Sequence, residues 1–222
     1  MKKLLAFLIA FLFMPNIAFA EGDLQVVDSN LIFVNNKNGY FFASVQNKGD
    51  KPVCYDNGVL NIVDKEGKTV FSNDFIRLSP YTSTINPGEY MYVMDRYISI
   101  ENIKDTEGLE PQFTVTAIEP EDEYAIFENE ATFEINDALE GSYMYVTFTN
   151  TSDEVKYDIA YSIALLDADG KIIFCDDKYT GLGLHPNATV TASIYINDDI
   201  IEHFAENNIV PVKADAVVKY GK

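Results

Sequence analysis

Histidine and cysteine, which often serve as catalytic base and nucleophile, are rare in this chain. The 222 residues include only two histidines and two cysteines. His185 precedes a proline in a predicted turn, where an extended and exposed conformation is expected, and His203 lies on a predicted helix. Cys175 is followed by two aspartates, which would raise the pKa of its thiol, whereas a cysteine nucleophile needs an electropositive neighbourhood. The sequence therefore predicts that the protein is not an enzyme.

A hydrolase of unknown type is the alternative, because the 35 acidic residues permit a carboxylate pair of the kind that glycosidases use. Nothing in the sequence singles out one carboxylate pair from the others. The motifs of serine hydrolases, zinc proteases and phosphate-binding loops do not occur. Asp167, Asp169 and Gly170 resemble the start of a calcium loop, but the third carboxylate and the closing bidentate glutamate are missing. We therefore expect no metal site and no cofactor.

Four aromatic side chains offer chemistry for binding. Tyr40 and Phe42 share the outward face of one predicted strand, and Tyr90 and Tyr92 share that of another. If these strands are neighbours in one sheet, the four rings form a flat aromatic face that suits a protein partner or sugar rings. We predict this face as the binding surface. In the other interpretation, aromatic residues are simply favourable in strands, and the rest of the protein covers the face.

The two cysteines, Cys54 and Cys175, occupy non-equivalent positions in different halves of the chain. A disulfide inside one domain is therefore not expected. An oxidising compartment would permit a bridge between the two halves. Two separate, buried thiols are the favoured interpretation, because the sequence alone cannot bring the two sulfur atoms within bonding distance.

The segments that must position these residues are repeated. Several residues recur 103 positions later: Asn47, Asp64, Gly67, Lys68 and Phe71 match Asn150, Asp167, Gly170, Lys171 and Phe174. A shared spacing of this kind indicates a duplicated domain. The predicted division is a signal peptide at 1–20, a first β-sandwich repeat at 21–119, an acidic linker at 120–123 and a second β-sandwich repeat at 124–222.

Strand patterns recur within each repeat. Residues 40–46 and 143–149 alternate apolar and polar side chains with the period of two that marks a half-buried strand. Further strands are predicted at 59–63, 69–71, 89–94 and 112–118, and at 162–166, 172–174, 188–195 and 212–218. The run from Asp198 to Phe204 predicts a short amphipathic helix. The predicted fold class is all-β, with two tandem antiparallel immunoglobulin-like β-sandwich domains and a short helix in the second.

In each repeat, a strand that ends in apolar-x-apolar-x-Asp is followed by an acidic residue, Gly and Lys, and later by a proline turn. These residues are Leu60–Lys68 with Pro87-Gly88, and Ile163–Lys171 with Pro186-Asn187. The pattern resembles the bacterial FxLYD-type domains, which are immunoglobulin-like modules of exported proteins. The second repeat departs from the pattern at Asn187, where glycine is usual. The resemblance covers only the centre of each repeat; it implies an extracytoplasmic location and no known catalysis, and it offers no functional residues to carry over.

The first twenty residues have the pattern of a secretory leader. Lys2 and Lys3 precede an apolar run of eleven residues, and Ala18-Phe19-Ala20 has the small-x-small pattern that signal peptidases cut after. Eleven helical residues span only about 16 Å, which is too short for a membrane anchor. We therefore expect cleavage at about Ala20 and a secreted, extracytoplasmic product.

The formal net charge is −19, which repels nucleic acid and anionic lipid and is compatible with cationic partners. We therefore expect no nucleic acid partner and no membrane span. The sequence predicts a secreted, non-catalytic β-sandwich protein that acts through protein–protein contact, with an unidentified protein or glycan outside the cell as its partner. The alternative is a carbohydrate- or cell-wall-binding module.

Overall fold

The computed structural model describes residues 23–34, 38–76, 78, 84–99, 106–120, 123–136 and 140–221. The predicted leader lies outside these ranges, as do residues 121 and 122 of the predicted linker. Within these ranges, no helix is long and apolar enough to cross a membrane.

The first half of the chain forms two antiparallel sheets. Its strands are β1 (Leu24–Val34), β2 (Asn38–Asn47), β3 (Val53–Val63), β4 (Thr69–Ile76), β5 (Thr84–Ile85), β6 (Tyr90–Ser99) and β7 (Glu110–Ile118). One sheet has the order β1-β2-β6. In the other, β3 pairs with β7 on one side and with β4 and the short β5 on the other. The pairing of β2 with β6 confirms that the two strands with the predicted aromatic surface are neighbours.

The second half repeats this pairing. Its elements are β8 (Tyr124–Ile126), β9 (Asn129–Glu134), β10 (Ser142–Thr149), β11 (Ile159–Leu166), β12 (Ile172–Thr180), β13 (Thr189–Ile196), α1 (Asp198–Glu206) and β14 (Lys213–Gly221). The sheet β9-β10-β13 corresponds to β1-β2-β6, and the sheet β12-β11-β14-β8 corresponds to β4-β3-β7. The prediction of an all-β, antiparallel sandwich fold with one short helix is therefore confirmed.

The repeated residues have the same local roles in both halves. Asp64 accepts hydrogen bonds from two backbone N–H groups in the turn between β3 and β4, and Asp167 accepts the same two bonds between β11 and β12. Gly67 and Gly170 both have a φ of 79°, a left-handed conformation that side chains disfavour. These residues therefore form a tight hairpin in each half, as the sequence predicts.

A buried asparagine anchors the loop that follows the central strand of each half. Asn47 donates from Nδ2 to two carbonyl oxygens at 2.7 and 2.8 Å, and Asn150 makes the same two bonds at 2.7 and 2.8 Å. Buried amide groups need such partners, because an unpaired one would lose its hydration without compensation. The recurrence of asparagine at these two positions therefore has a structural cause.

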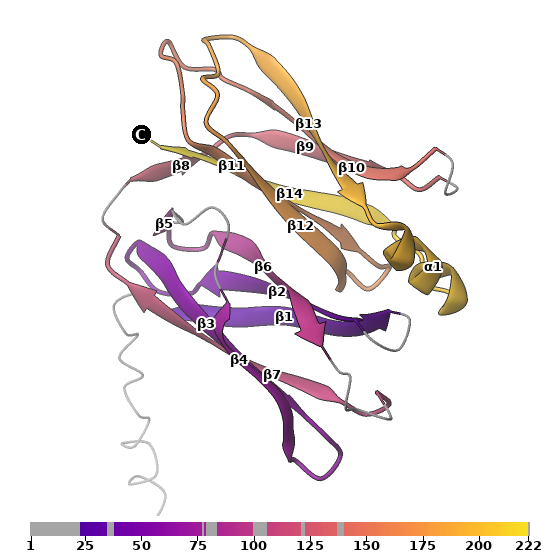
Figure 1. Ribbon diagram of the computed structural model, residues 1–222. Helices are drawn as coiled ribbons and strands as arrows, with labels where there is room; N and C mark the ends of the chain where they lie inside the picture. The colour runs from indigo at the N-terminus through magenta and orange to yellow at the C-terminus, as the bar shows by residue number, and fades with distance from the viewer. Residues whose placement is uncertain are drawn as a thin grey trace, which may run out of the picture.

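The four sheets stack as four layers. The sheet β4-β3-β7 lies at one end, followed by β1-β2-β6, then β12-β11-β14, and finally β9-β10-β13 (Figure 1). Each half of the chain is a two-layer sandwich with apolar side chains between its sheets. The two inner layers, one from each half, pack against each other, so the two sandwiches form a continuous stack.

The central strands β2 and β10 differ because of this stacking. In β10, buried and half-exposed residues alternate from Ser142 to Thr149, as expected of a half-buried strand. In β2, every residue from Gly39 to Val45 is buried. Phe41 packs inside the first sandwich, whereas Phe42 belongs to a core cluster shared with the second half. The prediction of a half-buried strand is therefore wrong for β2, because a second protein layer covers its outward face.

Helix α1 connects β13 to β14 at one end of the second sandwich. Asp198 and Asp199 in its first turn suit the positive end of the helix dipole. Ile200 and Phe204, four residues apart, are its buried side chains, which confirms the predicted amphipathic pattern.

Candidate functional site

The four aromatic residues predicted as a binding surface lie together, but they face the second half of the chain. The exposed fractions of Tyr40, Phe42 and Tyr92 are 9%, 0% and 7%, and Tyr90 is half-buried. The prediction that they form an exposed binding surface is therefore wrong. The physical reason is that the layer β12-β11-β14 covers this face, which removes the large apolar area of these rings from water.

Aromatic and small side chains bring the two inner layers into close contact. The ring of Phe42 meets Phe174 edge-on, with 5.5 Å between the ring centroids. In the same layer as Phe174, Ala160 and Ala164 of β11 are in register with Lys219 and Asp215 of β14, whose side chains bond residues of the first half. Because alanine side chains are short, they let the sheets approach closely and pack without large voids.

Two tyrosine hydroxyls bind one carboxylate across the interface. Tyr90 and Tyr92 donate to Oδ2 of Asp215 at 2.5 and 2.7 Å. Burial and the negative charge of Asp215 raise the pKa of both hydroxyls above the ordinary value for tyrosine. These residues line an interdomain cleft of about 340 Å³. Both phenols therefore stay protonated at neutral pH and hold the carboxylate by hydrogen bonds.

Two ion pairs also cross the interface. Arg96 pairs with Asp176, and Nζ of Lys219 lies 3.2 Å from Oε2 of Glu89. Lys219 is 1% exposed and also donates to a backbone carbonyl of the first half. Burial lowers the pKa of Lys219, although the charge of Glu89 opposes this, and burial raises the pKa of Asp176, although Arg96 opposes that. Such pairs add little net stability but fix how the two halves are positioned, because an unpaired buried charge is costly.

Both cysteines are free thiols. Cys175 is 2% exposed, and its Sγ contacts the carbonyl oxygen of Val93 across the interface at 3.6 Å. Burial, together with Asp176 and Asp177, raises the pKa of this thiol well above its ordinary value, so Cys175 is unsuited to act as a nucleophile. Cys54 is partly exposed, so the interpretation of two buried thiols is correct only for Cys175.

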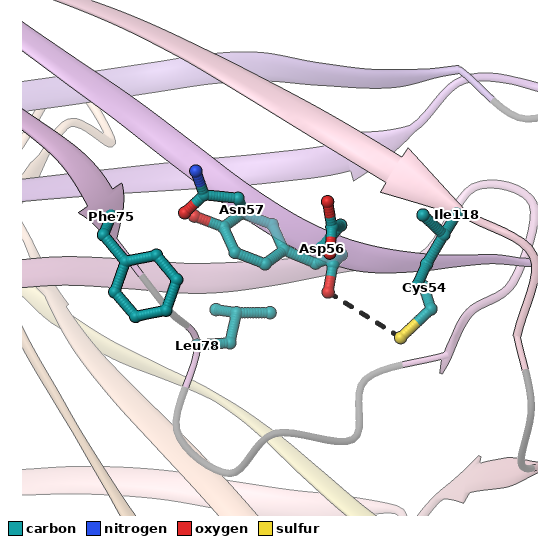
Figure 2. Close-up of a pocket in the computed structure, with 7 residues that line it drawn as sticks. Cys54, Asp56, Asn57, Phe75, Leu78 and Ile118 are labelled. Atoms are coloured by element: carbon teal, nitrogen blue, oxygen red, sulfur yellow. Dashed lines mark hydrogen bonds between the residues drawn. The ribbon is translucent and has the colours of Figure 1, made fainter.

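Cys54 lines an open pocket of about 380 Å³ on the end sheet of the first half. Figure 2 shows its sulfur directed toward the carbonyl oxygen of Tyr55, at 3.7 Å, with Phe75 and Ile118 on opposite sides of the pocket. A thiol and the carboxylate of Asp56 are the reactive groups among the residues that line it. Neither histidine is among these residues, so the pocket lacks the imidazole that usually activates a cysteine nucleophile.

The pocket lies beside the start of β3, where the short strand β5 pairs with it at Val53–Ile85 and Cys54–Thr84.

We expect one thiol of the native protein to react with Ellman's reagent, and two after unfolding in urea. Cys54 is partly exposed and Cys175 is buried, and reaction requires access to the thiolate. Cys54→Ser should abolish the native reaction, whereas Cys175→Ser should leave it unchanged. A native protein in which neither thiol reacts would contradict the exposure of Cys54.

The second half has an equivalent of the covered aromatic face, and this one is open. Tyr143 and Tyr145 of β10 correspond to Tyr40 and Phe42 of β2, and both are half-exposed. Tyr195 of β13 is 41% exposed. The sheet β9-β10-β13 is the last layer of the stack, so no further protein layer of the described chain covers these rings.

These three tyrosines form a cluster with two carboxylates at its border. The ring centroid of Tyr143 lies 6.1 Å from that of Tyr145 and 5.5 Å from that of Tyr195. The hydroxyl of Tyr145 donates to Glu134 at 3.2 Å, and that of Tyr195 donates to Asp198. We call these five residues the tyrosine face.

The two histidines lie in different surroundings. Burial lowers the pKa of His203, whose Nδ1 lies 3.3 Å from the side-chain amide of Asn207. His185 is exposed in the turn before β13. Among the residues that the structure describes, no three His, Cys, Asp or Glu side chains are grouped to hold a metal ion.

Sequence reasoning missed the tyrosine face, although a signal for it was present. At equivalent outward positions the first half has Phe42 and Tyr92, and the second half has Tyr145 and Thr191. Tyr145 and Thr191 are the more polar pair, which indicates that the face of the second half is the one exposed to solvent. By contrast, no sequence pattern marks Asp215, because its role depends on how the two sandwiches are placed.

Comparisons with known proteins do not identify the chain. No family model and no curated protein matches it. A solved structure of infectious bursal disease virus, Gt strain, aligns with a TM-score of 0.18 and 12% identity over 94% of this chain and 68% of the viral chain. A likeness this low carries no argument about fold or function.

Proposed function

We propose that this is an exported, non-catalytic protein that acts through contact with another protein, and that the tyrosine face is its contact surface. The observation that carries this proposal is the exposure of three clustered tyrosines on a sheet face whose counterpart in the first half is buried by a protein layer. Tyrosine is enriched at protein interfaces because its ring offers a large, rigid contact area and its hydroxyl binds polar groups.

Other features support the remaining parts of the proposal. The leader pattern at residues 1–20 and the resemblance to FxLYD-type domains both favour export. The non-catalytic character is supported by the arrangement of the reactive groups. Cys175 is buried at the interface with a raised pKa, Cys54 lies in a separate pocket, and neither histidine lines that pocket.

Site-specific crosslinking tests this proposal. We expect benzoylphenylalanine placed at Tyr145 or Tyr195, in the cells that export the protein, to crosslink to one and the same protein, identified by mass spectrometry. The matched control is the same photoreactive residue at Tyr157, which is 55% exposed outside the tyrosine face. Absence of a crosslink at both face positions, or the same products at all three positions, would rule out this contact surface.

A glycan is the second candidate partner. Beside the tyrosines, the hydroxyls of Thr147 and Thr191 lie 2.9 Å apart, and those of Thr149 and Thr189 lie 2.8 Å apart. Such a row of hydroxyls next to aromatic rings also suits sugar recognition. Under this alternative, the face positions would give no protein crosslink, and wild-type protein would bind a glycan array in a manner that depends on Tyr143.

A further inference from the structure

We infer that the tyrosine face binds a lysine- or arginine-rich segment of its protein partner. This inference rests on the proposed function and specifies the chemistry of the partner. It is carried by the order of the side chains across the sheet, by the charge of this end of the molecule, and by the absence of basic residues from its three strands.

The side chains form a row that crosses all three strands. Glu134 of β9 is in register with Tyr143 of β10, which is in register with Tyr195 of β13. Tyr195 in turn donates a hydrogen bond to Asp198. The row therefore has a carboxylate at each end and two rings between them. Cross-strand neighbours lie about 4.5–5.5 Å apart, so a basic side chain that lies over a ring also reaches a carboxylate.

This arrangement matches the chemistry of basic side chains. An ammonium or guanidinium group over a tyrosine ring gains a cation–π interaction, and the flat guanidinium of arginine also stacks on the ring. In Glu134 and Asp198, one carboxylate oxygen accepts from a tyrosine hydroxyl. The second oxygen of each carboxylate can accept a charge-assisted hydrogen bond from the incoming cation.

No basic side chain of these strands competes for the face. The segments β9, β10 and β13 contain no lysine, arginine or histidine, and β9 contributes Glu130 as well as Glu134. Residues 120–222 contain 20 acidic and 6 basic residues. The electrostatic field here attracts a basic segment, and we expect the association to weaken with rising salt.

A second copy of this chain does not supply such a partner through its opposite end face. The strands of that end sheet, β3, β4 and β7, contain no lysine or arginine. Its outward positions include neutral side chains. Asn61 of β3 is in register with Gln112 of β7, and Thr114 follows Gln112 on the same face of β7. The charge complementarity therefore favours a different protein over self-association.

The probe for this inference is a fluorescein-labelled peptide of eight residues that alternates arginine and glycine, measured by fluorescence polarisation at low salt. The test variant is Tyr143→Ser with Tyr195→Ser, and the matched control is Tyr157→Ser with Tyr179→Ser, two tyrosines that are 55% and 50% exposed elsewhere. Neither double substitution changes the net charge, so unspecific attraction of the peptide to an acidic protein affects the test variant and the control variant equally. We expect the test variant to bind about five- to tenfold more weakly, as for the loss of two cation–π contacts, and the control to change by less than about twofold.

An isosteric variant gives an independent measurement that does not depend on removing a ring. Glu134→Gln should weaken binding by about two- to fivefold, the effect of losing one exposed charge pair. Glu154→Gln, whose side chain is 80% exposed and lies off these strands, should weaken it less. Equal losses of peptide affinity in the face variants and in their controls would overturn the inference. Binding of a cationic glucosamine oligomer as tight as that of the peptide would also overturn it.

The two tests fail in different ways. Specific crosslinks at Tyr145 and Tyr195, without face-dependent peptide binding, would show that a protein binds here but that its contact segment is not basic. Loss of the specific crosslinks would instead remove the proposed function itself.

Discussion

Replacement of Phe42 by alanine is expected to lower the free energy of unfolding by about 3–5 kcal/mol, the range for removing a large aromatic side chain from a core. Phe42 is fully buried, and its ring meets Phe174 of the other half. The cavity would therefore open between the two sandwiches rather than inside one of them. Urea denaturation followed by circular dichroism measures the loss.

The matched control for this prediction is Tyr145→Ala, at the equivalent position of β10. Tyr145 is half-exposed on the tyrosine face, so its truncation should cost about 1 kcal/mol or less. The two substitutions remove similar aromatic side chains from equivalent strands, and they differ in whether a protein layer covers the ring. Equal losses would contradict the stacking of the inner layers.

The second large effect is expected at the buried ion pair. Glu89→Gln should lower the free energy of unfolding at neutral pH by about 2 kcal/mol, less than the roughly 3–5 kcal/mol for a fully buried pair. Lys219 is almost completely buried, whereas 22% of the Glu89 side chain is exposed. After the substitution, water at this exposed side can therefore partly solvate the ammonium group that has lost its partner. The pair of Lys156 and Glu154 provides the control, because the Glu154 side chain is 80% exposed and Glu154→Gln should cost about 0.5 kcal/mol or less.

The pH dependence of this variant distinguishes an electrostatic effect from lost packing. The pKa of Lys219 is lowered in the folded protein, so between the folded and unfolded pKa values the unfolded chain binds more protons, and stability rises with pH. Glu89→Gln removes a charge that raises this pKa. The alkaline rise in stability should then begin at a lower pH, and the difference from wild type should shrink toward about pH 10. A difference that stays constant with pH would contradict the electrostatic explanation.

Acid should destabilise the protein partly through Glu89, the other partner of the ion pair. Burial raises the pKa of Glu89, but hydrogen bonds from Asn86 and the charge of Lys219 outweigh burial, so the pKa lies below its ordinary value. A carboxylate with a lowered pKa stabilises the fold above its unfolded pKa, and this contribution is lost as the pH falls through the folded pKa. In Glu89→Gln, this part of the acid destabilisation should be absent.

The sequence was sufficient to predict each sandwich, because the information for it is local. The alternation at residues 143–149, the hairpins at Asp64 and Asp167 and the helix after Asn197 all arise from neighbouring residues, and all have the predicted structure. The contact between the sandwiches is different. It depends on which faces two preformed layers present to each other, and a period of two along β2 does not reveal whether the outward side chains meet water or protein.

The differences between the repeats follow from the same contact. Because scaffold residues recur, the positions that differ are natural candidates for function. In the structure, several of them lie at the interface instead. Tyr90 and Tyr92 occupy the positions that Thr189 and Thr191 occupy in the second half. Both tyrosines bind Asp215 of the second half. Their divergence is therefore explained by packing, and the candidate contact surface lies on the face that kept the more polar residues.

The shared core removes the independence that repeated domains usually have. In most tandem arrays a single domain can be excised, duplicated or exchanged, since each has its own soluble surface. The first sandwich alone would present Tyr40, Phe42 and Tyr92 to water as an uncovered apolar patch. We therefore expect the two sandwiches to be stable only as a pair, although the sequence predicts two separate domains.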